Sequence, residues 1–343
     1  MKQLLNTLFV LSTGSKLSRD GACILLEAPS RPPMRIPAAT LDGVVCMAGV
    51  NHTPPLLDLC VEHGVSLTYL SEYGRFIARM EGPVSGNVLL RRDQYRQADI
   101  PEKLADIARD IITGKLANAR QVLMRGARET ADAEKETLLR QATERIDGIR
   151  KRLVRTLDLE SLRGLEGEAG AVYWGVFGAL LVNADPAFTF TTRNRRPPKD
   201  PTNALLSFLY TLLMHDVRSA LEGVGLDPQA GFLHRFRPGR ASLALDLMEE
   251  FRAPVVDRLV LSLINRGQLA PGEFKQESGG GVIMSDDARR IVITAYQKRK
   301  QEEIVHPFLQ EKMPWGLLWH AQARLFARHI RGELDGYPVF FWK

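Results

Sequence analysis

The residues whose types and spacing could do chemistry lie in one stretch, residues 231–252, which reads GFLHRFRPGRASLALDLMEEFR. It opens with His234 in a turn rich in glycine and proline, and continues into an apolar-periodic helix that carries Asp246, Glu249 and Glu250. Positions three and four apart share a helix face, so Asp246 lies beside both glutamates. A neutral imidazole together with carboxylates is a mixed nitrogen and oxygen donor set, which suits a divalent cation such as Mg²⁺ or Mn²⁺.

Arginines in the same stretch indicate an anionic substrate. Arg235, Arg237 and Arg240 lie close to the histidine in sequence, and guanidinium groups match planar or tetrahedral oxyanions. Metal donors next to arginines predict phosphoryl chemistry. The competing interpretation is a solvated helix face beside a structural histidine, and periodicity does not choose between Glu249 and Glu250.

Two upstream segments must help to position such a site. A helix beginning near residue 159 carries Glu166 between Gly164 and Gly167, and glycine in a helix interior costs about 1 kcal/mol relative to alanine. Such glycines are expected where a neighbouring helix or a substrate approaches the backbone closely, and both explanations stay open. The next segment, residues 193–203, is a stiff basic loop with three prolines, and we expect Thr202 or Asn203 to cap the apolar helix that follows.

Composition allows a soluble protein of two domains. The chain has 343 residues, 46 Lys and Arg against 40 Asp and Glu, and a pI near 9.3, a modest basic bias that is compatible with nucleic acid. Three scattered cysteines read as free thiols in a reducing compartment. No apolar run is long enough to span a membrane, and polar residues at 6 and 7 interrupt the N-terminal one, so we reject a signal peptide and expect a cytoplasmic protein.

The order of elements predicts an α+β fold. Residues 1–97 form a β-rich domain of short apolar runs, with a hairpin turn at Ser18–Gly21 joining the runs at 8–11 and 22–26, and one helix over 54–63. From Pro101 the apolar spacing becomes helical, so residues 98–343 form a larger helical domain that carries the catalytic residues.

Four segments together carry a family resemblance. GLEGEAGAVYW (164–174), RRPPKDPTNALLSFLY (195–210), GFLHRFRPGR (231–240) and DLMEEFR (246–252) occur in the order and spacing of the CRISPR-associated spacer-acquisition integrase, the metal-dependent DNA endonuclease of CRISPR adaptation. The resemblance covers essentially the whole chain and implies that family's architecture, a β-rich N-terminal domain followed by a larger helical one. The C-terminal YPVFFW (337–342) is similar to the type I-C form.

The resemblance also implies roles for the candidate residues. Glu166, His234 and Glu249 match the metal ligands, and Asp246 matches an acid that shapes the site. The implied reaction is transesterification, in which a DNA 3′-hydroxyl attacks a phosphodiester; with water in its place the same site nicks DNA. Since a histidine ligand must be neutral, activity should fall below about pH 6 to 6.5. Glu168, where the family more often has a neutral residue, either faces solvent or adds charge near the metal.

The resemblance also implies partners for the protein, and its basic residues are candidates for contacts with DNA. The family's members act as dimers on double-stranded and branched DNA and clamp a small partner subunit, and we expect the N-terminal domain to serve dimerisation. The alternatives are a non-catalytic DNA-binding scaffold and a hydrolase of small phosphate esters. The expected contacts to DNA phosphates, which would make binding sensitive to salt, are Arg193, Arg195, Arg196, Lys199, Arg235, Arg237, Arg240 and Arg252.

Overall fold

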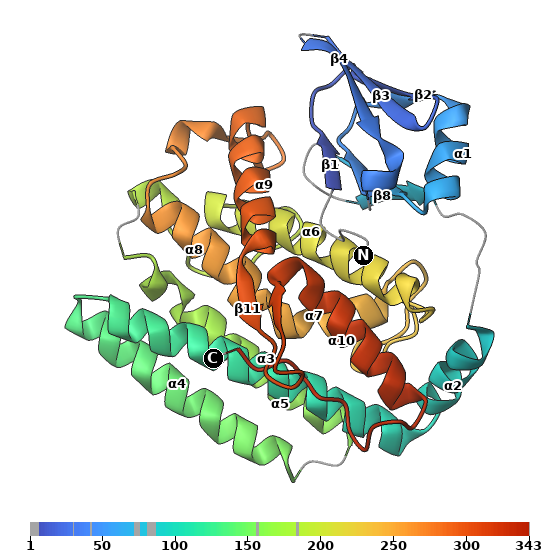
Figure 1. Ribbon diagram of the computed structural model, residues 1–343. Coiled ribbons are helices and arrows are strands. Elements are labelled where there is room, and N and C mark those ends of the chain that lie inside the picture. The colour runs from blue at the N-terminus through green and yellow to red at the C-terminus, as the bar shows by residue number, and fades with distance from the viewer. Residues whose placement is uncertain are drawn as a thin grey trace. The chain divides into compact units, whose positions relative to one another are not determined.

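The computed structural model describes residues 7–29, 31–41, 43–71, 76–80, 87–155, 158–182 and 185–342. The chain divides into two compact units. One consists of residues 1–85 with 284–294, and the other of residues 86–283 with 295–343. Figure 1 shows the first as mainly strands and the second as mainly helices.

Among its described residues, the first unit forms two four-stranded sheets. In one sheet the order is β1-β5-β7-β8, with the first three parallel and the last antiparallel; these strands are β1 (Thr7–Val10), β5 (Gly43–Cys46), β7 (Ser66–Leu70) and β8 (Phe76–Met80). The other has the order β4-β3-β2-β6, built from β4 (Arg31–Pro37), β3 (Cys23–Ala28), β2 (Lys16–Asp20) and β6 (Asn51–His52).

One apolar core holds these strands and helix α1 (Pro54–His63) together. Val44, Leu56 and Leu67 are completely buried in it. Val44 lies in β5, which is buried at all four positions, and Leu56 lies in α1, so apolar runs and not strict alternation mark this core in the sequence. Burial also raises the pKa of the Cys46 thiol to about 12, which keeps it protonated and unreactive.

The predicted N-terminal hairpin pairs the wrong strands. The turn does exist, but it joins β2 to β3, with Asp20 opposite Cys23. Strand β1 pairs instead with β5, in parallel and in the other sheet. Strands β2 and β4 carry too many charged residues and prolines for a hydrophobic-run criterion to detect them.

The described part of the second unit is helical and includes two short two-stranded sheets. The apolar periodicity from Pro101 is confirmed as one long helix. Helix α2, which the sequence reading included in the β-rich domain, precedes it. The helices are α2 (Val88–Ala98), α3 (Pro101–Glu129), α4 (Ala133–Leu153), α5 (Leu159–Val176), α6 (Pro201–Gly223), α7 (Ser242–Phe251), α8 (Arg258–Asn265) and α10 (Trp315–Ile330), while α9 (Asp286–Gln301) spans the division between the units. The short strands are β9 (Phe274–Gln276), β10 (Val282–Met284), β11 (Glu303–Val305) and β12 (Lys312–Pro314).

Aspartates begin three of these helices. Asp132 accepts hydrogen bonds from the first-turn amides of α4, and Asp158 does the same for α5. Helix α6 begins at Pro201 and is capped by Asp200, whose carboxylate accepts from the Asn203 amide at 2.7 Å. The predicted cap at Thr202 or Asn203 is therefore wrong, because proline at the first helical position sets the start one turn earlier.

Helix α3 contacts α4, α5 and α7, and Figure 1 shows α3 and α4 running side by side in opposite directions. Helix α10 packs against α6 and α7. This packing brings α3, α5 and α7, which are far apart in sequence, to one place. The α+β fold class is confirmed, and no helix among the described residues is long and apolar enough to cross a membrane.

Candidate functional site

The loop before helix α7 presents His234, and Gly231 allows that loop to close. A Cβ atom at Gly231 would lie 2.6 Å from Oδ2 of Asp246 and 2.7 Å from the Ser242 carbonyl carbon. No side chain fits there. The contact between the loop and the start of α7 therefore requires glycine, which explains the glycine three residues before the histidine.

Asp246, completely buried in helix α7, fixes the loop from the other side. Its carboxylate accepts hydrogen bonds from the backbone amides of Phe232, Leu233 and His234 at 2.6, 3.0 and 2.9 Å. The same carboxylate lies 2.5 Å from Nδ1 of His234. A carboxylate only accepts, so Nδ1 carries the proton of the neutral imidazole and Nε2 keeps its lone pair.

Helix α5 supplies Glu166 and a second tie to the histidine loop. The Arg163 guanidinium donates to the carbonyl oxygen of Leu233 at 2.7 Å. One turn later, Glu166 forms an ion pair with the ammonium group of Lys115, which projects from α3. Glu168 points elsewhere and pairs with Arg152 on the protein surface at 2.9 Å, so it does not add charge to the site.

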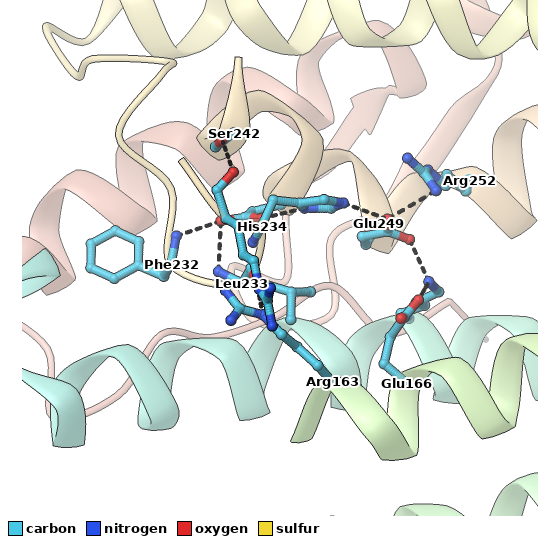
Figure 2. Close-up of polar contacts among 11 residues, drawn as sticks. Arg163, Glu166, Phe232, Leu233, His234, Ser242, Glu249 and Arg252 are labelled. Atoms are coloured by element: carbon cyan, nitrogen blue, oxygen red, sulfur yellow. Dashed lines mark hydrogen bonds and ion pairs between the residues drawn. The ribbon is translucent and has the colours of Figure 1, made fainter. Parts of the chain in front are cut away.

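Glu249 lies where these elements meet. Its side chain is only 2 % exposed, and cations approach both of its oxygens: Arg252 lies 2.9 Å from Oε1 and Lys115 lies 2.9 Å from Oε2. Nε2 of His234 is 3.9 Å from Oε1. Figure 2 shows Glu249 between the histidine and the arginine, with Glu166 on the adjoining helix.

Electrostatics keep this carboxylate ionised despite its burial. Burial alone would raise the pKa of Glu249, but the charges of Arg252 and Lys115 outweigh it and lower the pKa to about 2. Burial likewise opposes the charge on Lys115, yet the charges of Glu249 and Glu166 raise the pKa of its ammonium group. Glu249 and Lys115 therefore both keep their charges despite their burial.

Glu250, the neighbouring acid, faces a different part of the molecule. It accepts hydrogen bonds from the Tyr337 hydroxyl at 2.5 Å, the Phe340 amide at 2.6 Å and the Gln322 side chain at 2.8 Å. Burial raises the pKa of Glu250 to about 7, against the lowering effect of these hydrogen bonds. Periodicity alone left the two glutamates equivalent, whereas the structure separates their surroundings.

A π-helical segment, η4 (Arg252–Asp257), follows α7 and carries two charged residues of the site region, Arg252 and Asp257. Such segments often occur at functional sites. The Arg252 guanidinium lies over the ring of Tyr210, 5.2 Å from its centroid. Asp257 is buried and accepts hydrogen bonds from the hydroxyls of Tyr210 and Tyr173. Burial raises the pKa of Asp257 to about 6, although both tyrosines act in the opposite direction.

A cavity of about 460 Å³ adjoins these groups. Lys115, Glu166, Glu249 and Arg252 line it. Further lining residues are Gly167, Gly170, Tyr173, Trp174, Arg193, Arg195, Tyr210 and Asp257. A Cβ atom at Gly164, Gly167 or Gly170 would meet no other atom within 4 Å. The glycines of α5 are therefore not explained by a close helix crossing within this chain, and two of them open the cavity wall.

The donors fit a divalent cation, although no group of three His, Cys, Asp or Glu side chains within the described residues is already arranged around one. The Lys115 ammonium already bridges Glu166 and Glu249, which shows that the two carboxylates converge on a shared cation. Nε2 of His234 has its lone pair free, because Asp246 engages Nδ1. Two carboxylates and one imidazole suit Mg²⁺ or Mn²⁺.

The predicted phosphate contacts fall into three groups. Arg193 and Arg195 line the cavity, and Arg193 also donates to Asn203 Oδ1 at 2.7 Å. Arg252 is engaged by Glu249. The remaining residues lie on loops outside the cavity lining, with Arg235 paired to Glu160 at 2.6 Å; they are Arg196, Lys199, Arg235, Arg237 and Arg240.

Lys115 is the main residue that sequence reasoning missed. It follows Ile111 by four positions and Ile112 by three, so it lies on the apolar face of α3. A charged residue on a buried helix face requires a partner, and that was the available signal. Asp257, an acid within the mainly apolar run at 253–261, gave a signal of the same kind, whereas Tyr173 and Tyr210 did not, because tyrosines in apolar helices are ordinary core residues.

Paired carboxylates, a histidine with a free Nε2 and guanidinium groups around one cavity are typical of an enzyme that acts on phosphodiester bonds. Residues 8–298 match the family model described as CRISPR associated protein Cas1. The chain is 52 % identical to CRISPR-associated endonuclease Cas1 1 of Chlorobaculum tepidum and 50 % identical to CRISPR-associated endonuclease Cas1 2 of Rhodospirillum rubrum, in both cases over all of each chain. The chain belongs to the Cas1 family of CRISPR-associated endonucleases.

Solved structures show the same fold. The Cas1-containing chain of a Cas6-RT-Cas1–Cas2 complex aligns with a TM-score of 0.85 and 22 % identity, over 100 % of this chain and 37 % of that one. A casposase bound to its integration product aligns with a TM-score of 0.82 and 21 % identity, over 96 % and 92 %. The family model and the two curated relatives confirm the predicted family and enzyme class.

Proposed function

We propose that this chain inserts spacer DNA into a CRISPR array by transesterification, in which a DNA 3′-hydroxyl attacks a phosphodiester, and that it nicks DNA when water takes the place of the hydroxyl. The observation that carries the proposal is the convergence of Glu166, Glu249 and His234 beside a cavity lined by guanidinium groups. The integration product in the related casposase structure agrees with this chemistry.

Glu166, His234 and Glu249 would hold the metal, Mg²⁺ or Mn²⁺. When bound, it supplies Lewis acidity to the phosphodiester and stabilises charge on the leaving oxygen. Asp246 keeps the His234 imidazole in the tautomer whose Nε2 can bind a cation. Arg252 holds Glu249 ionised and fixed in orientation.

Arg193 and Arg195 would bind phosphate oxygens of DNA that enters the cavity. Arg196, Lys199, Arg235, Arg237 and Arg240 would extend this contact along the DNA backbone. Double-stranded and branched DNA are the proposed substrates. We also propose that residues 98–343 form the catalytic domain, that residues 1–97 serve a homodimer in the cytoplasm, and that a small partner subunit of the adaptation complex binds that dimer, in agreement with the Cas1–Cas2 complex among the similar structures.

A comparison of two glutamates on helix α5 tests the catalytic assignment. Glu166→Gln removes a carboxylate of the site, and Glu168→Gln removes one that pairs with Arg152 at the surface. We expect Glu166→Gln, like His234→Ala, to bind branched DNA normally and to lose metal-dependent strand transfer, whereas Glu168→Gln retains it.

A non-catalytic scaffold would show no strand transfer in the wild type under EDTA, Mg²⁺ or Mn²⁺, even after addition of the small partner subunit. A hydrolase of small phosphate esters would instead turn over a chromogenic phosphodiester without DNA. Either result would contradict the proposed function.

A further inference from the structure

The Lys115 ammonium group occupies the position between the two carboxylates of the site. It forms ion pairs with Glu166 and, at 2.9 Å, with Oε2 of Glu249. The side chains of Lys115 and Glu166 are 20 % and 31 % exposed and that of Glu249 is 2 % exposed, so these charges are partly shielded from water. Two carboxylates brought together in such surroundings repel each other strongly unless a cation separates them.

A divalent cation held by both Glu166 and Glu249 would compete with the Lys115 ammonium group for these two carboxylates. An ammonium group and a metal ion cannot both lie between the same two oxygens, because they overlap sterically and repel each other. Either the lysine leaves when the metal binds, or the metal binds these carboxylates only weakly.

Of the two cations on Glu249, Lys115 is the one that can move. Arg252 is 17 % exposed and stacks over the Tyr210 ring at 5.2 Å, so its guanidinium is held on two sides. Lys115 has a flexible four-carbon side chain and lines the cavity of about 460 Å³, which gives the displaced ammonium group room.

We propose that Lys115 is an exchangeable internal counter-ion, which holds Glu166 and Glu249 together in the metal-free protein and moves into the cavity when a divalent cation binds. This inference rests on the proposed metal site. It adds a residue to the reaction site on α3 and makes metal affinity depend on a competition inside the protein.

Titration of the full-length protein with Mn²⁺ in a calorimeter tests the competition. In Lys115→Met the competitor is absent and the side-chain volume is retained, so the dissociation constant for Mn²⁺ should decrease roughly fivefold or more, the usual lower range of coupling between two bound groups. Thermal unfolding in EDTA should show the opposite effect, a lower melting temperature for Lys115→Met, because the carboxylates lose their counter-ion. Excess Mn²⁺ should remove most of that difference.

Lys300→Met is the matched control. Lys300 is also buried and pairs with Asp216 at 2.9 Å, away from the cavity lining. Its removal should lower the melting temperature equally with and without Mn²⁺ and leave the affinity for Mn²⁺ unchanged. If Lys115→Met binds Mn²⁺ no more tightly than the wild type does, the inference is wrong while the metal site stands. If wild type and Glu249→Gln bind Mn²⁺ identically, the metal site itself is wrong.

A measurement on the wild type keeps the test independent of folding in the variants. Brief acetylation followed by mass spectrometry reports whether each lysine is accessible. We expect Lys115 to be protected in EDTA and acetylated faster in Mn²⁺, with Lys300 protected in both. Equal protection of Lys115 in the two conditions overturns the proposal.

Discussion

The adjacent acids Glu249 and Glu250 show how one position along a helix changes the environment of a carboxylate. Glu249 is surrounded by cations, whereas Glu250 receives three neutral hydrogen-bond donors. Family resemblance favoured Glu249 as a ligand from sequence alone. Helical spacing could not choose between the two glutamates, because both fit the periodic pattern about equally well and the pattern does not show which neighbours each side chain contacts. Lys115 escaped prediction for a related reason: its partners are 51 and 134 positions away in the chain.

Gly167 offers a test at a single position in the cavity wall. Gly167→Ala places a methyl group where no protein atom lies within 4 Å, so the helix should gain about 0.5–1 kcal/mol of stability. The methyl group also enters the cavity, so strand transfer should fall. Gly148→Ala in α4 is the control, since that glycine also has open space but does not line the cavity. Full activity in Gly167→Ala would show that DNA does not approach this wall.

Asp257 predicts how stability depends on pH. Its folded pKa of about 6 is raised above the ordinary value of 3.8 by burial, against the opposing effects of Tyr210, Tyr173, Arg252 and Arg193. Because the folded-state pKa is raised, Asp257 contributes its full stabilisation at pH values below the unfolded-state pKa. This contribution is lost as the pH rises through about 6. Urea unfolding in EDTA should therefore show that Asp257→Asn reduces the loss of stability between pH 5 and 7.5 by on the order of 1 kcal/mol. Parallel pH profiles of the two proteins would contradict this.

At the scale of elements, the C-terminal tail braces helix α7 against α3 and α10. Asn118 of α3 donates to the carbonyl oxygens of Glu250 and Phe340, at 2.7 and 2.9 Å, and accepts from the Trp342 amide at 2.7 Å. Gln322 of α10 joins Glu250 to Tyr337. The sequence predicted the long helices well, since their apolar periods are strong. It could not predict this brace, because its contacts join residues more than 70 positions apart, apart from the contact between Gln322 and Tyr337.

Tyr337→Phe tests the brace. The change removes the hydroxyl that donates to Glu250 and leaves a buried carboxylate with fewer partners, so urea unfolding should show a loss of about 1–3 kcal/mol. Tyr95→Phe, which removes a hydroxyl that donates to Asp227 from a partly exposed ring, should cost less. Equal stability of Tyr337→Phe and wild type would mean that the tail does not support α7.

For the whole molecule, the order of elements predicted the α+β architecture, because the change from short apolar runs to helical periodicity persists over more than a hundred residues. The family followed from the resemblance of the four segments at 164–174, 195–210, 231–240 and 246–252. Individual strand partners were not predicted. Strand β1 pairs with β5 rather than with its neighbour in sequence, and a parallel pairing has no local turn to reveal it.

The basic bias of the molecule predicts that DNA binding depends on salt. Arg196 and Lys199 are exposed on the loop before α6. If both contact phosphates, the double change to alanine should reduce the slope of log affinity against log salt concentration by roughly 2, about one for each residue. The exposed Arg140 on α4, paired with Glu136, is a control whose change to alanine should leave the slope unaltered. A slope that the double variant does not alter would remove this loop from the DNA contact.

The most direct test of the catalytic assignment is strand transfer on branched DNA in Mn²⁺ by Glu249→Gln and Glu250→Gln, with the small partner subunit present. Each change replaces a buried carboxylate of α7 by an amide of the same size. We predict that Glu249→Gln lowers the rate by roughly a hundredfold or more while DNA binding persists. Glu250→Gln should retain strand transfer, because a neutral side chain satisfies most of its contacts. Loss of strand transfer in Glu250→Gln alone would contradict the assignment of the third metal ligand.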